Sequence, residues 1–313
     1  MKHVFILNPS AGKKKDIEEF CQNIRQAMEG REYEILFTEY GGHAEELACA
    51  AAQTGEQVRI YGCGGDGTLN EVVCGAAGYD NAAVTNIPRG TGNDFLKIFG
   101  PNFRQAFSDL EALADGPQAA FDLIDCNGKL GLGVVCAGVD ARIADDVHKY
   151  KKLPLVSGMG AYILSLIENV LFKGISRPTK VRVEGESLNG HTSIICICNG
   201  RYYGGGFMPV GDAMPDDGIL DILYVPKVSL FTFARLVGKY AKGRYRDFPD
   251  LIRHFHCQEI EFESEQEIVT VVDGEVMRGN SFHAALSDKK INFFYPAYVN
   301  YKDAPEAVEA GAL

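Results

Sequence analysis

The sequence lacks an excess of basic residues. Its 313 residues include 31 Lys and Arg against 42 Asp and Glu, so the formal net charge is −11 and the isoelectric point is about 5.2. A nucleic-acid-binding domain carries a basic footprint, so we expect no nucleic-acid partner. Attraction to anionic lipid would have to rely on a local basic patch.

Long hydrophobic runs are also missing. The longest apolar stretch has 15 residues, from Leu153 to Ile167, with one proline and two glycines near its start. A membrane-spanning helix needs about 20 apolar residues, so we expect a buried helix here, or a helix that lines an apolar substrate cleft. The basic cluster directly before it keeps a transient contact with a membrane surface open: Lys149, Lys151 and Lys152.

The chain shows neither a secretory signal nor a cysteine motif. Its apolar start at Val4–Leu7 is too short for a signal core and ends at Asn8-Pro9. The nine cysteines include no Cys-x-x-Cys pair, and most lie among Ala, Val and Gly, where a thiol behaves as a small apolar residue. We therefore expect reduced core thiols and a cytoplasmic protein, rather than a disulfide set or a cysteine metal site.

What the sequence does contain is length for two domains. The first third alternates strand and helix patterns with short connections, which is typical of a doubly wound parallel sheet. Apolar residues at three- and four-residue steps between Asp16 and Met28 indicate an amphipathic helix. The other expected elements of this α/β domain are strands at Val4–Leu7, Tyr33–Thr38, Val58–Tyr61 and Ala83–Ile87, and helices at Ala44–Gln53 and from about Thr68.

After Gly116-Pro117 strand-like runs dominate, so the second domain should be β-rich and antiparallel. We place the domains at 1–122 and 123–313, with the last strand and tail either in the second domain or returning to the first. Two helices are expected there, in the Leu153 region and at Ser229–Lys242. The expected strands are Val181–Glu184, Ser193–Cys198, Leu220–Val225, Glu259–Glu263, Ile268–Val272 and Ile291–Tyr295.

The most informative segment runs from Gly62 to Glu71, with the letters GCGGDGTLNE between a strand and a helix. Glycines let backbone N–H groups approach phosphate oxygens, and the N-terminus of the following helix favours negative charge. The segment has no Walker lysine and does not have the spacing of the dinucleotide fingerprint. By itself it fits either a phosphate-binding loop or a tight turn.

A second glycine turn follows the next strand, from Gly90 to Phe95, and the first strand ends at Asn8. In a parallel sheet, loops at the carboxyl ends of neighbouring strands face the same crevice. Three polar strand ends on one edge therefore predict a nucleotide-binding site. An acidic loop residue such as Asp66 beside a polyphosphate requires a cation, which implies Mg²⁺.

These segments occur in an order that resembles the lipid kinases with a diacylglycerol-kinase catalytic domain, in their soluble bacterial form. The resemblance covers nearly the whole chain, and the Gly-Gly-Asp-Gly element alone is shared with NAD kinases. Its components are Asn8-Pro9 with Gly12, Thr38, Gly64 to Glu71, Gly90 to Phe95, Asp212 to Gly218 and Asp273-Gly274-Glu275.

The resemblance implies an N-terminal three-layer α/β nucleotide-binding domain and a C-terminal antiparallel β-sandwich domain. It places Asp66 and Asp94 near the phosphates of ATP and their Mg²⁺, and makes Glu275 the proton acceptor for a lipid hydroxyl. Taken without the family, Glu275 would read as part of a plain hairpin turn. The residues expected to contact the nucleotide are Asn8, Thr38, Gly64, Gly65, Asp66, Gly67, Thr68, Leu69, Asn70 and Thr91.

Four carboxylates lie between Asp212 and Asp221, around a turn. The side chain of Asp217 and the backbone carbonyls of Met214 and Ile219 offer three hard oxygen ligands. The family places a structural Mg²⁺ there, and the alternative is a solvated acidic turn. The network that would link this metal to the cleft is expected to include Asp122 and Lys152.

His254 and His256 alternate along a strand-like segment and so share one face. No third ligand stands at a readable spacing, so we interpret them as ordinary strand residues rather than a metal pair.

The sequence thus predicts an ATP-dependent lipid kinase that phosphorylates a membrane-derived, diacylglycerol-like acceptor and touches the membrane briefly. The alternatives are a kinase of a soluble acceptor such as NAD, and a non-catalytic lipid- or nucleotide-binding regulator on the same scaffold. The sequence leaves open whether the protein forms a homodimer.

Overall fold

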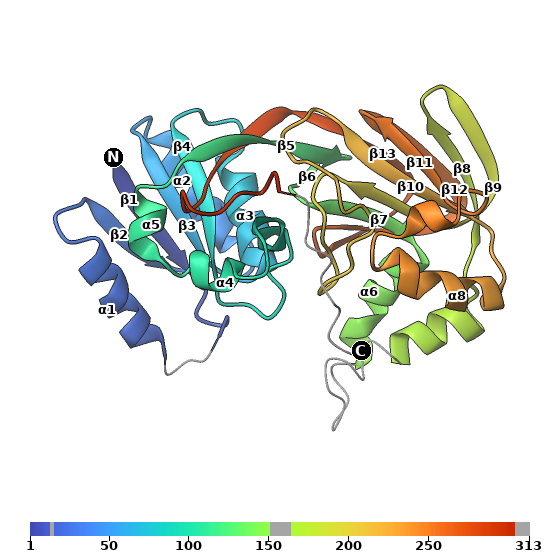
Figure 1. The fold of residues 1–313 in the computed structure, drawn as a ribbon, viewed down its shortest axis with the longest axis horizontal. Helices are drawn as coiled ribbons and strands as arrows, with labels where there is room; N and C mark the ends of the chain where they lie inside the picture. Colours follow the sequence, from blue (N-terminus) through green and yellow to red (C-terminus); the bar gives the residue numbers. More distant parts are fainter. Residues whose placement is uncertain (13–15, 151–163, 304–313) are drawn as a thin grey trace. The chain divides into compact units, whose positions relative to one another are not determined.

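The computed structural model describes residues 1–12, 16–150 and 164–303 (Figure 1). The chain folds as two compact units, one from Met1–Leu123 with Asp288–Leu313 and the other from Ile124–Ser287. Two strands, β5 (Gln118–Cys126) and β13 (Glu275–Phe294), contribute residues to both units. Each unit is described by itself.

The first unit is built on a parallel sheet in the order β4-β3-β1-β2, and the end of β13 adds to β4 in parallel. Every residue of β3 is buried, as expected for a parallel strand covered on both faces. The strands are β1 (Lys2–Leu7), β2 (Tyr33–Phe37), β3 (Val58–Gly64) and β4 (Ala82–Pro88).

Three helices connect these strands: α1 (Ile17–Ala27), α2 (His43–Gln53) and α3 (Asp66–Ala76). The connection from β1 to β2 runs across the sheet in the opposite direction to those from β2 to β3 and β3 to β4. Right-handed crossovers therefore put α1 on one face and α2 with α3 on the other. Helices α2 and α3 pack on each other, and the three-layer α/β architecture is confirmed.

Aromatic side chains fill the remaining core of this unit. They come from η2 (Phe95–Phe99), α4 (Phe103–Ala106), the start of β5 and the end of β13, while α5 (Leu110–Ala114) packs on α1. Phe293 lies 5.4 Å from both Phe95 and Phe121 between ring centroids. Edge and offset ring contacts of this kind add to the burial of apolar area.

The second unit is antiparallel. Its strands follow the order β11-β10-β9-β7-β12-β13, β8 pairs with both β9 and β12, and β6 pairs with β5. The β-sandwich-like class predicted from the sequence is confirmed. The strands are β6 (Lys129–Gly131), β7 (Val134–Gly138), β8 (Arg177–Val183), β9 (Glu186–Cys198), β10 (Leu220–Pro226), β11 (Arg253–Cys257) and β12 (Glu259–Val272).

Alternation along these strands creates two cores. On β9, Ile195 and Ile197 face a core formed between strands, whereas Ile194 and Cys196 face a core covered by helices. The covering helices are α6 (Val139–Tyr150), the helical residues 164–167 that continue into η3 (Glu168–Phe172), α8 (Leu230–Tyr240) and η4 (Tyr245–Asp247).

Three sequence-based expectations differ from the structure or fall outside it. The runs Glu259–Glu263 and Ile268–Val272 belong to one strand, β12, whose pairing shifts register between Glu263 and Ile268. The run Ile291–Tyr295 is not a separate strand, because its residues up to Phe294 are the end of β13. The first part of the expected Leu153 helix and the basic residues Lys151 and Lys152 lie outside the described residues.

Within residues 1–12, 16–150 and 164–303, every helix is too short or too polar to cross a bilayer. All nine cysteines are free, and most are buried. Burial of most of them agrees with the expectation that these thiols behave as small apolar residues.

Candidate functional site

The first strand ends at the carboxyl edge of the parallel sheet, where Asn8 meets its neighbours. Its backbone N–H donates to Cys63 O at the end of β3 (3.1 Å), and its side-chain Nδ2 donates to Thr68 Oγ1 in α3 (3.2 Å). The N–H of Thr38, just after β2, donates to Leu7 O (2.9 Å). The strand ends that the sequence pointed to therefore lie side by side in one unit.

The two glycine loops touch each other directly. Gly64 O accepts hydrogen bonds from the N–H groups of Arg89 (2.9 Å) and Gly90 (3.1 Å). A Cβ atom added to Gly90 would lie 2.5 Å from Gly65 Cα, which is closer than real side chains come to backbone. Glycine is required here because the two backbones leave no room for a side chain.

Asp66, the first residue of α3, holds the second loop in place. Its Oδ2 accepts from the N–H of Asn93 (2.8 Å), and its Oδ1 accepts from the N–H of Asp94 (2.5 Å). Burial, followed by the nearby charge of Asp94, raises the pKa of the Asp66 carboxyl above its usual range, against the lowering effect of these hydrogen bonds. The charge of one carboxylate near the other favours a neighbouring cation, and carboxylate oxygens are also the ligands that Mg²⁺ prefers.

Two cationic side chains complete this loop, and the sequence-based reasoning missed both. Lys97 Nζ pairs with Asp94 Oδ1 at 2.5 Å, and the i,i+3 spacing was the signal that could have revealed it. Arg104 donates to three consecutive carbonyls, those of Gly90 (3.0 Å), Thr91 (2.7 Å) and Gly92 (3.1 Å). No sequence signal linked Arg104 to the loop.

The remaining residues that the sequence predicts to contact the nucleotide differ in solvent exposure. Gly67 and Thr91 are exposed, so both are open to a ligand. Thr68, Leu69 and Asn70 are buried, so their side chains hold the start of α3 rather than reaching solvent. Backbone N–H groups are what this helix start offers a phosphate.

In the second unit, Glu275 begins β13 just after a two-residue hairpin. Asp273 and Gly274 both have positive φ (45° and 92°), the conformation of a type I′ turn, and Val272 pairs with Glu275. The Glu275 carboxylate forms an ion pair with Lys129 Nζ (2.7 Å) and remains 44% exposed. Lys129 therefore anchors this carboxylate, which is still partly accessible to solvent.

The side chain of Asp273 explains why the hairpin is rigid. Its carboxylate accepts hydrogen bonds from the N–H groups of Leu132 (2.6 Å), Gly133 (3.0 Å) and Val134 (2.8 Å). Charge-assisted bonds to backbone are among the stronger hydrogen bonds in proteins. The turn before Glu275 is thus fixed to the start of β7.

The acidic turn also lies in the second unit. Asp217 is exposed, and its Oδ1 accepts from the N–H of Ile219 (3.0 Å). A carboxylate with the backbone carbonyls of Met214 and Ile219 is an oxygen-only donor set, which suits Mg²⁺. Asp212 is bound instead by Arg246 (2.9 Å). Asp122, expected in the same network, pairs with Lys290 (2.7 Å) in the first unit.

Comparisons with known proteins extend over nearly the whole chain. The family described as "Diacylglycerol kinase catalytic domain" matches residues 2–126, and the one described as "YegS C-terminal NAD kinase beta sandwich-like domain" matches residues 133–291. A "Putative lipid kinase" of Staphylococcus carnosus is 26% identical over 281 residues, covering 90% of this chain and 83% of its own. A protein of the same description from Staphylococcus epidermidis is 27% identical over 266 residues, with 84% and 77% covered.

Solved structures agree in fold. A crystal structure titled as a "putative diacylglycerol kinase" from Bacillus anthracis str. Sterne superposes with a TM-score of 0.74 at 24% identity and covers 94% of this chain and 95% of its own. A diacylglycerol kinase structure from the same organism gives a TM-score of 0.68 at 21% identity, with 94% and 96% covered. At these identities the likeness concerns the fold.

Proposed function

Because this chain belongs to the lipid kinase family that joins a diacylglycerol kinase catalytic domain to a YegS-type C-terminal domain, we propose that it phosphorylates a diacylglycerol-like, membrane-derived lipid. Kinases of this domain use ATP as co-substrate. The observation that carries the proposal is the pair of glycine loops, which meet at Gly64, Gly65 and Gly90 with the Asp66 carboxylate between them.

In the first unit, this chain's part in phosphoryl transfer is binding and positioning. The exposed backbone at Gly67 and Thr91 would hold the phosphates of ATP at the start of α3. Asp66 and Asp94 would hold Mg²⁺. When bound, Mg²⁺ would offset the negative charge of the phosphoryl group during its transfer. Correct placement of the reacting groups accounts for most of the catalysis in reactions of this class.

Glu275 is the residue that we assign to the proton of the lipid hydroxyl. Its carboxylate is exposed enough to meet a substrate, while Lys129 and the Asp273 turn limit where it points. A base must stand within hydrogen-bond reach of the proton that it accepts, so an anchored carboxylate is suited to this role.

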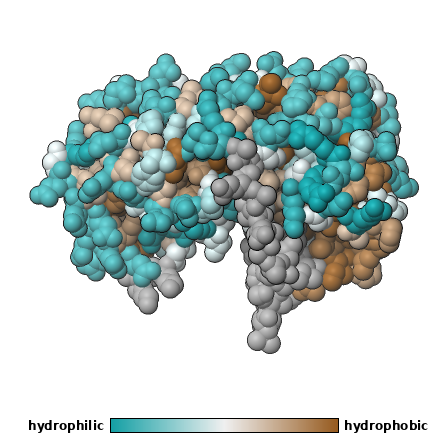
Figure 2. Space-filling view, viewed as in Figure 1, coloured by the Kyte–Doolittle hydropathy of each residue, from teal (hydrophilic) through white to brown (hydrophobic). Residues whose placement is uncertain are grey.

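A lipid acceptor is supported by an apolar surface on the second unit. The helical residues 164–172 and α8 bury one face against the same core, through residues such as Leu166 and Phe233. Their outer faces leave large apolar side chains in solvent, with Phe172 81% and Phe231 79% exposed. Figure 2 shows hydrophobic surface, in brown, over this part of the second unit. This membrane-contact surface consists of Leu164, Ile167, Leu171, Phe172, Leu230 and Phe231.

The occupant that suits this surface is a lipid bilayer. Apolar side chains enter the boundary between headgroups and acyl chains, and cations beside them interact with anionic headgroups. The exposed Lys227 and Arg235 flank Phe231 along the chain, and Lys149 lies on α6. We propose that the enzyme docks through this surface briefly, as a peripheral protein on the cytoplasmic side.

The decisive assay follows labelled γ-phosphate from ATP to a panel of lipids in vesicles, with and without Mg²⁺. Glu275→Gln and Asp66→Asn should each lower kcat by at least ~100-fold, the scale of a lost base or a lost electrostatic contact. Glu263→Gln is the matched control, since Glu263 is also ion-paired, with Lys180 at 3.2 Å, and is 48% exposed.

Near wild-type turnover in both site variants would refute the site assignment. Phosphorylation of water-soluble acceptors without vesicles would replace the lipid by a soluble substrate, and ATP or lipid binding without turnover would indicate a regulator. The surface has its own test, in which Phe172→Ser with Phe231→Ser should weaken vesicle binding at least ~10-fold and leave ATP affinity unchanged.

A further inference from the structure

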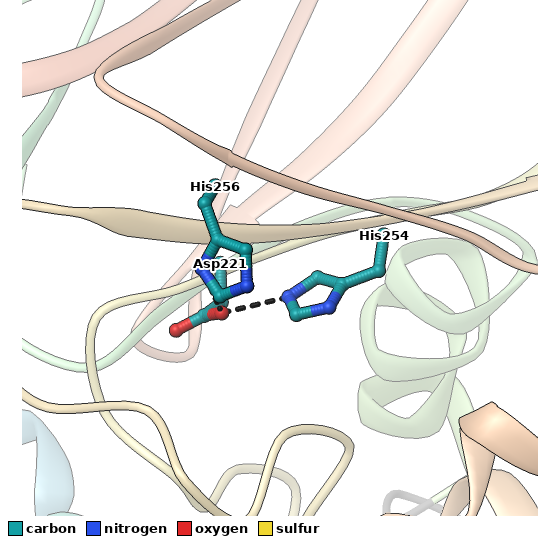
Figure 3. Close-up of side chains that lie close together, drawn as sticks. All are labelled: Asp221, His254 and His256. Atoms are coloured by element: carbon teal, nitrogen blue, oxygen red, sulfur yellow. Dashed lines mark hydrogen bonds and ion pairs between the residues drawn. The ribbon is translucent and has the colours of Figure 1, made fainter.

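Three metal-ligating side chains from two neighbouring strands meet at one face of the second unit (Figure 3). Asp221 lies on β10, and His254 and His256 lie on β11. The antiparallel register places Asp221 directly opposite His256, while His254 is two residues away on the same face. The pairing of the strands therefore supplies the third ligand that the sequence spacing of the two histidines did not show.

The donor atoms of these side chains point at a common position. Asp221 Oδ1 lies 2.7 Å from His254 Nε2 and 3.2 Å from His256 Nδ1, and all three atoms lie within 4.8 Å of one another. In a tetrahedral site with bonds of about 2.0 Å to nitrogen and oxygen, ligand atoms are about 3.3 Å apart. The separation of Asp221 Oδ1 from His256 Nδ1 is close to this value, and its separation from His254 Nε2 is about 0.6 Å shorter, so side-chain rotations that move these two atoms apart would be needed to admit an ion.

A fourth side chain orients the first imidazole. The Tyr245 hydroxyl lies 2.9 Å from His254 Nδ1, and its ring packs edge-on against the imidazole at 4.9 Å. A metal-ligating histidine commonly donates its other N–H to a hydrogen-bond partner. With an ion bound, Nδ1–H of His254 would donate to the Tyr245 hydroxyl, and the ion would take the place of the hydrogen bond that now joins His254 Nε2 to Asp221 Oδ1. Tyr245 is buried, with 3% of its surface exposed, so this orientation is enforced by packing.

The burial of Asp221 and the exposure of His256 are also typical of a metal site. Asp221 is 5% exposed, so its carboxylate is held away from competing water, whereas the side chain of His256 is 59% exposed and leaves a path for an ion. The nearby cation Arg246 is already paired with Asp212 at 2.9 Å. A carboxylate with two imidazoles selects Zn²⁺ and similar transition metals over Mg²⁺.

We propose that Asp221, His254 and His256 form a Zn²⁺ site that ties the edge strand β11 to β10, with water as the fourth ligand. The site shares no residue with the kinase residues assigned above, and its donor set differs from the oxygen ligands of the acidic turn. The proposal is therefore independent of the proposed function.

The test titrates Zn²⁺ alone into the full chain, stripped of metal with a chelator, by calorimetry. One Zn²⁺ should bind per chain, and His256→Ala should weaken it by at least ~100-fold, beyond the ~10–100-fold typical of a lost outer partner. His283→Ala is the matched control, because His283 is likewise exposed on a strand and pairs with a carboxylate, Glu259 at 3.1 Å. It should bind Zn²⁺ as the wild type does.

Thermal unfolding gives a second readout. Saturating Zn²⁺ should raise the Tm of the wild type and of His283→Ala but not of His256→Ala. Circular dichroism checks that His256→Ala is folded, which its exposed position favours, whereas Asp221 is too buried for a clean substitution. Absence of Zn²⁺ binding by the wild type, wild-type affinity in His256→Ala, or an equal loss in His283→Ala would overturn the proposal.

Discussion

Arg104 offers a direct test of how the second glycine loop is held. Its guanidinium donates three hydrogen bonds to the carbonyls of Gly90, Thr91 and Gly92, at 2.7 to 3.1 Å. Because Arg104 is exposed, each bond contributes about 0.5 kcal/mol, the low end of the usual range. Arg104→Ala therefore removes about 1.5 kcal/mol of free energy that holds the loop in its ordered conformation. ATP binding must then provide this free energy to order the loop. We expect about tenfold weaker ATP affinity.

The assay is calorimetric ATP binding in the presence of Mg²⁺, together with KM for ATP in the lipid kinase reaction. Arg31→Ala is the control, because Arg31 lies in the same unit, is partly exposed, and binds Asp115 through two hydrogen bonds, at 2.8 and 2.7 Å. Unchanged ATP affinity in Arg104→Ala would refute the reasoning, and so would an equal loss in Arg31→Ala.

Three further predictions concern packing and pH. Gly90→Ala, whose Cβ would overlap Gly65, should lower the free energy of unfolding by about 1–3 kcal/mol and weaken ATP binding, whereas Gly41→Ala, with open space around it, should do neither. Burial lowers the pKa of His3 to about 4. As the pH falls from 6.5, His3 is therefore protonated in the unfolded chain at a higher pH than in the folded protein. Stability should drop by up to about 3 kcal/mol between pH 6.5 and 4, and His3→Gln should remove this part of the urea-unfolding profile. Burial raises the pKa of Asp140 to about 7, so stability should fall as pH rises from 4 to 7. Asp140→Asn should therefore raise the Tm at pH 8 and leave it unchanged at pH 4.

Most helices and strands could be predicted from local patterns of apolar residues in the sequence. The helix expected from Asp16 to Met28 is α1 at Ile17–Ala27, and the strand expected at Leu220–Val225 is β10 at Leu220–Pro226. Such patterns succeed because burial of one face imposes a period of 3.6 or 2 on the apolar residues. They were less informative for β12, where polar residues around a register shift divide one long strand into two apparent runs.

The candidate site divides in the same way. Glycines and carboxylates in the two loops were visible because their residue types are required within a few positions along the chain. Arg104, by contrast, reaches its loop from α4 and binds carbonyls, which any residue could supply. A side chain that binds backbone carbonyls far along the chain therefore produces no recognisable sequence pattern.

By itself, the sequence determined the α/β and β-rich halves, the family, and the two glycine loops, because periodicity and backbone freedom are local properties of the chain. Tertiary structure alone decided which side chains meet. Strand register brought Asp221 to His254 and His256, and loop packing placed Asp66 on the backbone of Asn93. Both depend on hydrogen bonds and packing between segments far apart in the sequence, which no local spacing records.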